Sequence, residues 1–433
     1  MSRDPREILA TEPMGRLQVV AVTMCILLTA LDGFDVLSIS FAAPGIAAEW
    51  GIDRAALGLV LSMELIGMGV GSLMIGTVAD HFGRRPMILA CLVVMTAGMG
   101  LAATADTLAV LSVYRFVTGL GIGGMLASTN AMVAEYANDR HRSLAVALMA
   151  GGYPLGAVVG GSIVSVLLVW YDWRSVFVFG AVLTALFIPL VWFLLPESVS
   201  YLAEKRPRGA LARVNRTLER MGHAAVAELP APQEAVSTSG LAALFRPGLV
   251  RVTVLLTAAY FAHIMTFYFI IKWIPKLVVD MGFAAPLAGS VLVWFNVGGM
   301  TGSVLLGLLT HRFDLRRLVI AFLLLASIAV VVFGQGQADL VQLSVVAALG
   351  GFFTNAAIVG LYALFAQSFP TAVRAGGTGF AIGVGRGGAA LGPIAAGLLF
   401  VAGASLPLVA LVMATGSVIG AGALALLGRS AGR

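Results

Sequence analysis

The segment LQVVAVTMCILLTALDGFDVLSISF, residues 17–41, is predominantly apolar and long enough to cross a bilayer as a helix. Two carboxylates interrupt it, Asp32 and Asp35. An ionised acid at the bilayer centre costs at least about 2.5–3.5 kcal/mol on insertion scales, so two on one helix are expected only where they face a polar pathway or titrate. The segment therefore predicts a membrane-embedded helix whose acids take part in proton exchange.

The composition of the whole chain agrees with a membrane protein. Of its 433 residues, 59% are hydrophobic and 11% are charged, and the mean hydropathy is +0.98. A soluble domain does not have this composition. Roughly twelve apolar stretches are long enough to span a bilayer, near residues 17–41, 55–78, 86–104, 108–134, 144–169, 173–195, 250–275, 286–310, 317–334, 339–367, 375–401 and 404–428. The first is expected to be a permanent span, because it is too long for the apolar region of a signal peptide.

The longest polar segment divides the spans six and six. We therefore expect an all-α integral membrane protein, with a first bundle over residues 1–195, a linker over 196–249 and a second bundle over 250–433. Within the linker, Leu211, Val214 and Leu218 recur at helical spacing beside several arginines. This pattern fits a basic amphipathic helix on the inner leaflet or, equally, a solvated connector. Residues 230–240 have the composition of a flexible linker.

Basic residues indicate the orientation. Most of the 27 Lys and Arg fall at the two termini and in alternate connections, which predicts a multi-pass inner-membrane protein with both termini cytoplasmic. The residues expected on the opposite side are Arg54, Arg174, Lys272 and Lys276. The net charge of +6 thus reflects topology and gives no reason to expect a nucleic-acid partner.

Enzymatic chemistry finds little support in the sequence. The five histidines are dispersed, and Cys25 and Cys91 lie singly within apolar stretches. The glycine-rich runs lie inside hydrophobic spans and lack the Gly-Lys-Ser/Thr ending of a phosphate-binding loop. We expect no metal, no cofactor and no ATP hydrolysis, and we favour a proton gradient as the energy source.

The sequence GTVADHFGRR, residues 76–85, resembles the signature loop of the major facilitator superfamily. Asp80 can accept from a neighbouring helix N-terminus and pair with Arg84 or Arg85 in a latch that breaks as the bundles rock. The alternative is that the two arginines only anchor the orientation. Related positions after the fourth and tenth spans add Glu135, Arg142 and Arg374 as candidate gating residues.

Further motifs resemble the aromatic acid:proton symporters of that superfamily. They are DGFD at 32–35, RFVTGLGIGG at 115–124, YPLG at 153–156, WRSVF at 173–177, PES at 196–198, KWIPK at 272–276 and GRGG at 385–388. The resemblance covers nearly the whole chain. It implies a monomer that imports a small aromatic carboxylate such as a benzoate or hydroxybenzoate, with protons, by alternating access.

Arg386, midway along the eleventh span among glycines, could bind a substrate carboxylate bidentately. The resemblance also implies a functional arginine there. The alternative is a structural ion pair with Asp32, Asp35 or Glu64. Aromatic and polar residues in the spans are further candidates for substrate contacts, although most such rings lie in a core or face lipid: Phe34, Tyr260, His263, Phe267, Tyr268, Trp294, Asn296, Phe352, Phe353 and Tyr362.

Asp32, Asp35 and Glu64 are the candidate proton carriers, because burial disfavours the charged form of a carboxyl while a nearby cation favours it. We favour the aspartate pair, since residues three apart share a helical face and are expected to titrate one after the other. Arg115 resembles the arginine that the superfamily associates with proton transfer. It can act only on a neighbouring acid, or else it snorkels to the outer interface.

Three rival functions stay open. A symporter of a non-aromatic organic acid, such as a muconate-like dicarboxylate, would need a second cation beside Arg386, for which Lys272 is a candidate. A drug/proton antiporter is disfavoured because GYPLG at 152–156 lacks the Gly-Pro pair typical of that class. A membrane receptor that senses the acid without moving it is the third.

Overall fold

The computed structural model describes residues 3–230, 241–370 and 373–427, without the side chains of Gly76, Thr77, Asp80, Leu241 and Ala375. These residues form fifteen α-helices and one short 3-10 helix, and twelve of the α-helices are long and apolar enough to cross a membrane. The first six spanning helices are α2 (Arg16–Trp50), α3 (Arg54–Phe82), α4 (Arg84–Ala102), α5 (Leu108–Tyr136), α6 (Arg142–Trp170) and α7 (Arg174–Leu194). The second six are α10 (Val250–Asp280), α11 (Ala285–Leu309), α12 (Leu315–Gly334), α13 (Leu340–Ser368), α14 (Arg374–Val401) and α15 (Leu406–Leu427).

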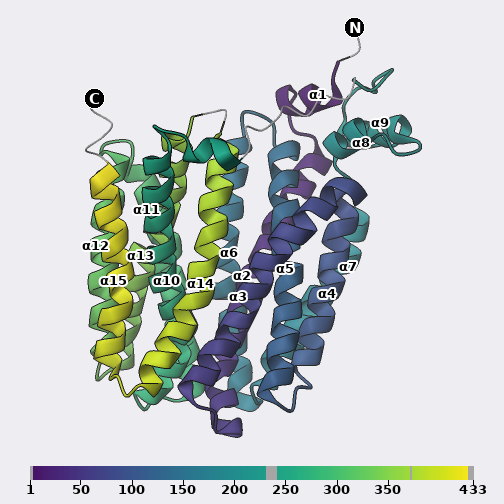
Figure 1. Ribbon diagram of the computed structural model, residues 1–433. Helices are drawn as coiled ribbons and strands as arrows, with labels where there is room; N and C mark the ends of the chain where they lie inside the picture. The colour runs from purple at the N-terminus through teal and green to yellow at the C-terminus, as the bar shows by residue number, and fades with distance from the viewer. Residues whose placement is uncertain (1–2, 231–240, 371–372, 428–433) are drawn as a thin grey trace.

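The spanning helices stand side by side as two groups, α2 to α7 and α10 to α15, with α3 and α14 where the groups meet (Figure 1). This confirms the predicted fold class. Two helices run further than their apolar stretches. α2 continues past residue 41 to Trp50, and α10 continues past residue 275 to Asp280, because residues near their ends, such as Ile46 and Val278, are still buried against neighbouring helices.

The two described ends of the chain lie on one face of the molecule, together with α1 (Pro5–Thr11), α8 (Val199–Lys205), α9 (Ala210–Met221) and the 3-10 helix η1 (Leu241–Phe245) (Figure 1). We call this the terminal face. Several helices begin with a polar cap there or on the opposite face; Asp53, for example, accepts at 2.7 Å from the backbone N–H of Ala56 and starts α3.

The linker helix α9 uses its apolar side to pack on the protein. Val214 and Leu218 are fully buried, whereas Arg213 and Arg216 are exposed. Just beyond α9, the ring of His223 lies 2.9 Å from Glu12 and 2.8 Å from Gln18, as expected for a connector docked on the first bundle. The buried apolar side is therefore not available to a lipid leaflet. The predicted flexible segment lies, from residue 231 on, outside the described residues.

The two bundles touch closely on the face opposite the termini. There Ser62 of α3 donates to the Ala390 carbonyl of α14 at 2.6 Å, and Arg54 pairs with Asp280 of α10 at 2.9 Å. In Figure 1, α3 and α14 converge toward this opposite face. Toward the terminal face, Leu73 and Met74 of α3 are 72% and 63% exposed. The two bundles therefore lie closer together, along α3 and α14, at the opposite face than at the terminal face.

Glycines allow the backbones of α2 and α6 to pack closely against each other. A Cβ on Gly33 would collide with the carbonyl of Tyr153, and one on Gly156 would collide with the carbonyl of Ala30. Backbones this close can pack only where side chains are absent. The contact fixes the segment of α2 that carries the two buried aspartates.

Replacement Gly156→Ala should therefore destabilise the protein, because the added methyl group overpacks the α2–α6 contact at a cost of about 1–3 kcal/mol. The matched control is Gly151→Ala on the same helix, where a Cβ would meet nothing within 4 Å. Its stability should be unchanged or slightly higher, as Ala is the better helix former. Thermal unfolding in detergent measures both, and equal melting temperatures for the two variants would contradict this account of the contact.

Candidate functional site

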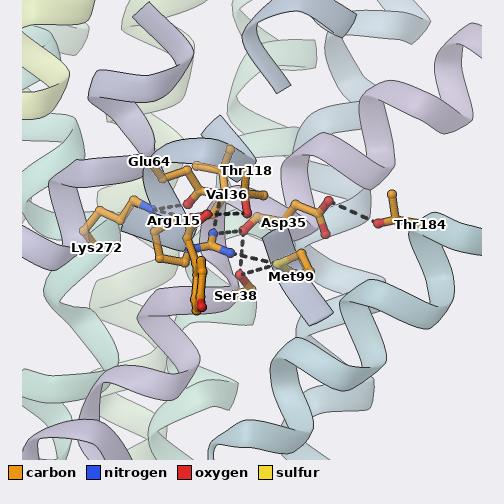
Figure 2. Close-up of polar contacts among 10 residues, drawn as sticks. Asp35, Val36, Ser38, Glu64, Met99, Arg115, Thr118, Thr184 and Lys272 are labelled. Carbon is orange, nitrogen blue, oxygen red and sulfur yellow. Dashed lines mark hydrogen bonds and ion pairs between the residues drawn. The ribbon is translucent and has the colours of Figure 1, made fainter. Parts of the chain in front are cut away.

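Three charged side chains from three helices meet at the centre of the molecule. Arg115 of α5 forms an ion pair with Glu64 of α3, and Lys272 of α10 lies 3.6 Å from the other carboxylate oxygen of Glu64. All three side chains are fully buried, and Figure 2 shows the carboxylate between the two cations. We call these three residues the central charge cluster. It joins both bundles, because Lys272 comes from the second.

Arg115 is held from several sides. Its guanidinium donates to the backbone carbonyl of Asp35 at 2.9 Å and lies 2.8 Å from the Met99 sulfur (Figure 2). It also sits 5.3 Å from the centre of the Phe177 ring. A guanidinium engaged in this way does not reach an interface. The snorkelling alternative for Arg115 is therefore wrong, and its position suits an action on the neighbouring acids.

Lys272 differs from its expected position on the opposite side of the membrane. Its ammonium donates to the backbone carbonyl of Val36 on α2, as well as facing Glu64 (Figure 2). The sequence misplaced it because the apolar stretch ends near Pro275, whereas the helix continues to Asp280. The apolar neighbours of Lys272 in the sequence could have indicated its burial. Its neighbours Ile270, Ile271, Trp273 and Ile274 are all buried with it.

Asp32 and Asp35 are both buried on α2 but face different partners. One oxygen of Asp35 accepts from Thr184 at 3.4 Å, and its carboxylate interacts electrostatically with Arg115. Both oxygens of Asp32 are without a hydrogen-bond partner among the described residues, and the cation acting on it is Arg386. The two acids thus repel each other, yet each is compensated by a different arginine.

Arg386 of α14 is partly exposed and lies within electrostatic range of three phenols. It interacts electrostatically with Tyr260, Tyr268 and Tyr362 as well as with Asp32. The hydroxyls of Tyr260 and Tyr362 lie 2.9 Å apart and their rings 5.7 Å apart. Within the described residues, no carboxylate lies in salt-bridge distance of Arg386, so the alternative of a fixed ion pair with Asp32, Asp35 or Glu64 does not hold in this arrangement. We call Arg386 and the three tyrosines the arginine–tyrosine cluster.

Four other predicted substrate contacts lie elsewhere. Phe34 is buried inside the first bundle, 5.3 Å from the Phe179 ring. Both ring nitrogens of His263 are engaged inside the second bundle, by Ser417 and by the Thr354 carbonyl, each at 2.9 Å. Trp294 is 51% exposed on α11, while the buried amide nitrogen of Asn296 donates to its own helix. Of the predicted contacts, the structure thus gathers Tyr260, Tyr268 and Tyr362 around Arg386.

Three of the predicted gating residues, Arg84, Glu135 and Arg142, line a cavity of about 680 Å³ on the terminal face of the first bundle. Glu135 accepts from Ser198 at 2.6 Å and from the backbone N–H of Ser200 at 3.0 Å. Arg142 pairs with Asp139 at 2.8 Å and donates to the carbonyl of Ala134. In the second bundle, Arg374 donates to the Phe369 carbonyl at 3.3 Å.

The loop before α4 departs in part from the expected latch. The side chain of Asp80 lies outside the described residues, and the carboxylate that caps α4 is that of Glu197, which accepts from the backbone N–H groups of Arg84 and Arg85 at 2.9 and 3.2 Å. The Arg85 guanidinium reaches the carbonyl and ring of Trp192. Sequence reasoning noted Glu197 only within a motif, because its neighbour α4 is more than a hundred residues away in the chain.

Comparisons with known proteins show which chains are similar to this one. A sequence model of the Major Facilitator Superfamily matches residues 25–292 and 256–432. The 4-hydroxybenzoate transporter PcaK of Pseudomonas putida is 34% identical over 397 residues, covering 90% of this chain and 88% of that protein. A gallate transporter of the same organism is 29% identical and covers 94% and 90%. A benzoate transport protein of Acinetobacter baylyi is 29% identical and covers 87% and 82%.

A solved structure shows the same fold. The bacterial homologue of the human lysosomal transporter Spinster, in an inward-facing and occupied conformation, superposes with a TM-score of 0.73 at 16% identity, covering 94% of this chain and 96% of that chain. The likeness extends over both bundles, as the coverage requires.

Removal of the Glu197 carboxylate should loosen the start of α4. Because the carboxylate caps two backbone N–H groups at a helix N-terminus, Glu197→Ala should lower the free energy of unfolding by about 1–2 kcal/mol. Glu197→Gln keeps one acceptor and should lose less. Glu204→Ala, at an exposed position of α8, is the control and should melt like the unaltered protein in detergent. A melting temperature of Glu197→Ala equal to that of the control would contradict the capping role.

Proposed function

The chain belongs to the major facilitator superfamily, whose matched relatives are transporters and not enzymes, and we propose that it imports a small benzoate-like or hydroxybenzoate-like carboxylate together with protons. The observation that carries this proposal is the partly exposed Arg386, which interacts electrostatically with three tyrosines and has no carboxylate in salt-bridge distance among the described residues. The names of the relatives, transporters of 4-hydroxybenzoate, gallate and benzoate, support an aromatic acid as the substrate class.

The arginine–tyrosine cluster offers partners for both the carboxylate and the ring of an aromatic acid. The planar guanidinium of Arg386 can hold a carboxylate through two parallel hydrogen bonds. The rings of Tyr260, Tyr268 and Tyr362 can pack against an aromatic ring, and their hydroxyls can bind ring substituents. A dicarboxylate would need a second available cation, but the candidate Lys272 is already engaged by Glu64 and Val36. This favours an aromatic monocarboxylate over the muconate-like alternative.

The position of Asp32 supports proton coupling. Its buried oxygens have Arg386 as their compensating cation and no hydrogen-bond partner among the described residues. When a substrate carboxylate binds Arg386, two anions compete for one cation, and the buried acid is neutralised by taking up a proton. Substrate and proton then enter the site together, which is the requirement for symport.

Alternating access and orientation complete the proposal. The distribution of basic residues supports a cytoplasmic location for the terminal face, and the bundles are in contact on the opposite face through pairs such as Arg54 with Asp280. The Ser62–Ala390 contact lies one turn of α14 beyond Arg386 toward the opposite face, so an imported acid leaves the arginine–tyrosine cluster toward the terminal face. Rocking of the two bundles around the cluster then exposes it to the periplasm.

Replacement Arg386→Lys tests substrate binding. Lysine keeps the charge but loses the bidentate geometry, so the KM for benzoate or 4-hydroxybenzoate should rise ~10-fold or more, equivalent to at least about 1.4 kcal/mol. Uptake of labelled acids into proteoliposomes measures this. Arg317→Lys, at an exposed position of α12, should leave the KM unchanged. Unaltered uptake kinetics in Arg386→Lys would remove Arg386 from the site.

Replacement Asp32→Asn tests proton coupling. The amide cannot take up the proton, so accumulation driven by an inward proton gradient should fall to the level of equilibration, while exchange of internal for external substrate continues. The variant Asp35→Asn distinguishes the contribution of Asp35 from that of Asp32. Asp339→Asn, at an exposed position, is the control. Normal accumulation in both Asp32→Asn and Asp35→Asn would contradict the coupling mechanism.

Concentrative uptake of muconate or of a cationic drug in place of benzoate would instead contradict the proposal that the substrate is an aromatic carboxylate.

A further inference from the structure

Lys272 brings a buried positive charge from the second bundle into the first. Its ammonium contacts the Val36 carbonyl of α2 and lies 3.6 Å from Glu64 of α3, whereas its own helix, α10, belongs to the second bundle. The side chain is fully buried. Any movement that separates α10 from α2 and α3 at this level must break both contacts.

The two cations beside Glu64 differ in how they move. Arg115 and Glu64 lie on neighbouring helices of the same bundle, so their ion pair persists when the bundles rock. Lys272 moves with the other bundle. A buried carboxylate beside two cations is stabilised in its ionised form, and loss of one cation shifts the balance toward the protonated form. The charge state of Glu64 is thereby tied to the position of Lys272.

We propose that Lys272 is a positioning residue for proton coupling, which keeps Glu64 ionised while the opposite face is closed and releases it for protonation when that face opens. This inference rests on the proposed symport. On opening, water from the opposite face delivers a proton to the Glu64 oxygen that Lys272 leaves. On closing, the returning ammonium displaces that proton, which departs toward the terminal face. Arg115 keeps Asp35 as an electrostatic partner throughout.

The groups that surround Glu64 allow this assignment. Those that face it or interact with it electrostatically are Arg115 on α5, Lys272 and Tyr268 on α10, Asp32 and Asp35 on α2, and Tyr153 on α6. Of these, Lys272 is the cation whose helix lies in the other bundle. In this proposal the charge of Asp32 depends on Arg386 and hence on bound substrate. The charge of Glu64 depends on Lys272 and hence on the conformation of the bundles.

Replacement Lys272→Met removes the cation and keeps an apolar side chain of similar length, which leaves Glu64 paired with Arg115 alone. In proteoliposomes, substrate exchange should continue with its KM within about 2-fold of the original, because Arg386 is untouched. Gradient-driven accumulation and the protons carried per substrate, read with a pH dye, should fall sharply. Lys272→Arg keeps a cation and should restore accumulation in part.

The matched control is Lys276→Gln, one turn further along α10, where the lysine pairs with Asp280 near the end of the helix. It should accumulate substrate normally. The double variant Lys272→Met with Glu64→Gln should couple no worse than Glu64→Gln alone, because both changes act on one contact. Independent, additive losses would overturn the proposal.

A conformational measurement distinguishes this role from a purely structural one. Ser62→Cys places a thiol at the closed contact with Ala390, and an impermeant maleimide added from the opposite face should label it faster in the Lys272→Met background. Unchanged labelling with unchanged proton stoichiometry would overturn the inference. If the unaltered protein carries no protons with an aromatic acid, the proposed function fails; if it does and Lys272→Met does so equally well, only the role of Lys272 fails.

Discussion

The compensation of charge inside a membrane is the constraint on which this structure depends. Neither Arg115 nor Lys272 could lie fully buried without an acid beside it, and Glu64 supplies that acid to both. Breaking such a pair by removing one partner typically costs about 3–5 kcal/mol, because the remaining charge is buried and uncompensated. The central charge cluster therefore fixes α3, α5 and α10 relative to one another at one level of the membrane, and the close-packed glycines of α2 and α6 bring the aspartates to the same region.

The arginine–tyrosine cluster follows a different physical rule. Arg386 has no acid in salt-bridge distance among the described residues, it is partly exposed, and its neighbours are phenols that stabilise a cation only weakly. A cation in this setting gains more from an arriving carboxylate than one that is already paired. The protein thus carries two kinds of arginine environment. Arg115 is buried and paired within the fold, whereas Arg386 is partly exposed and has no carboxylate in salt-bridge distance among the described residues.

Much of the fold could be predicted from the sequence, because a bilayer demands long apolar helices and leaves a strong signal in the chain. The twelve spans and the division into two groups follow from apolar runs and one long polar segment. The ends of the helices were harder to predict from the sequence, because burial against neighbouring helices keeps polar end segments helical. For this reason Lys272 was expected at the membrane surface. The central residues Asp32, Asp35, Glu64, Arg115 and Arg386 were identifiable because a charge within an apolar run is costly and must have a reason.

The partners of these residues could not be read from the sequence in the same way. An aromatic ring in a spanning helix has the same local sequence whether it faces the core, the lipid or a binding site, so Phe34, His263 and Trp294 could not be told apart from Tyr268 and Tyr362. Only the packing of distant helices separates them. The same packing assigns Asp32 to Arg386 and Asp35 to Arg115, although the two acids are three residues apart on one helix. Two acids three residues apart on α2 thereby interact with different parts of the molecule. Asp32 interacts with Arg386 of the second bundle, whereas Asp35 interacts with Arg115 of the central charge cluster, which joins the bundles.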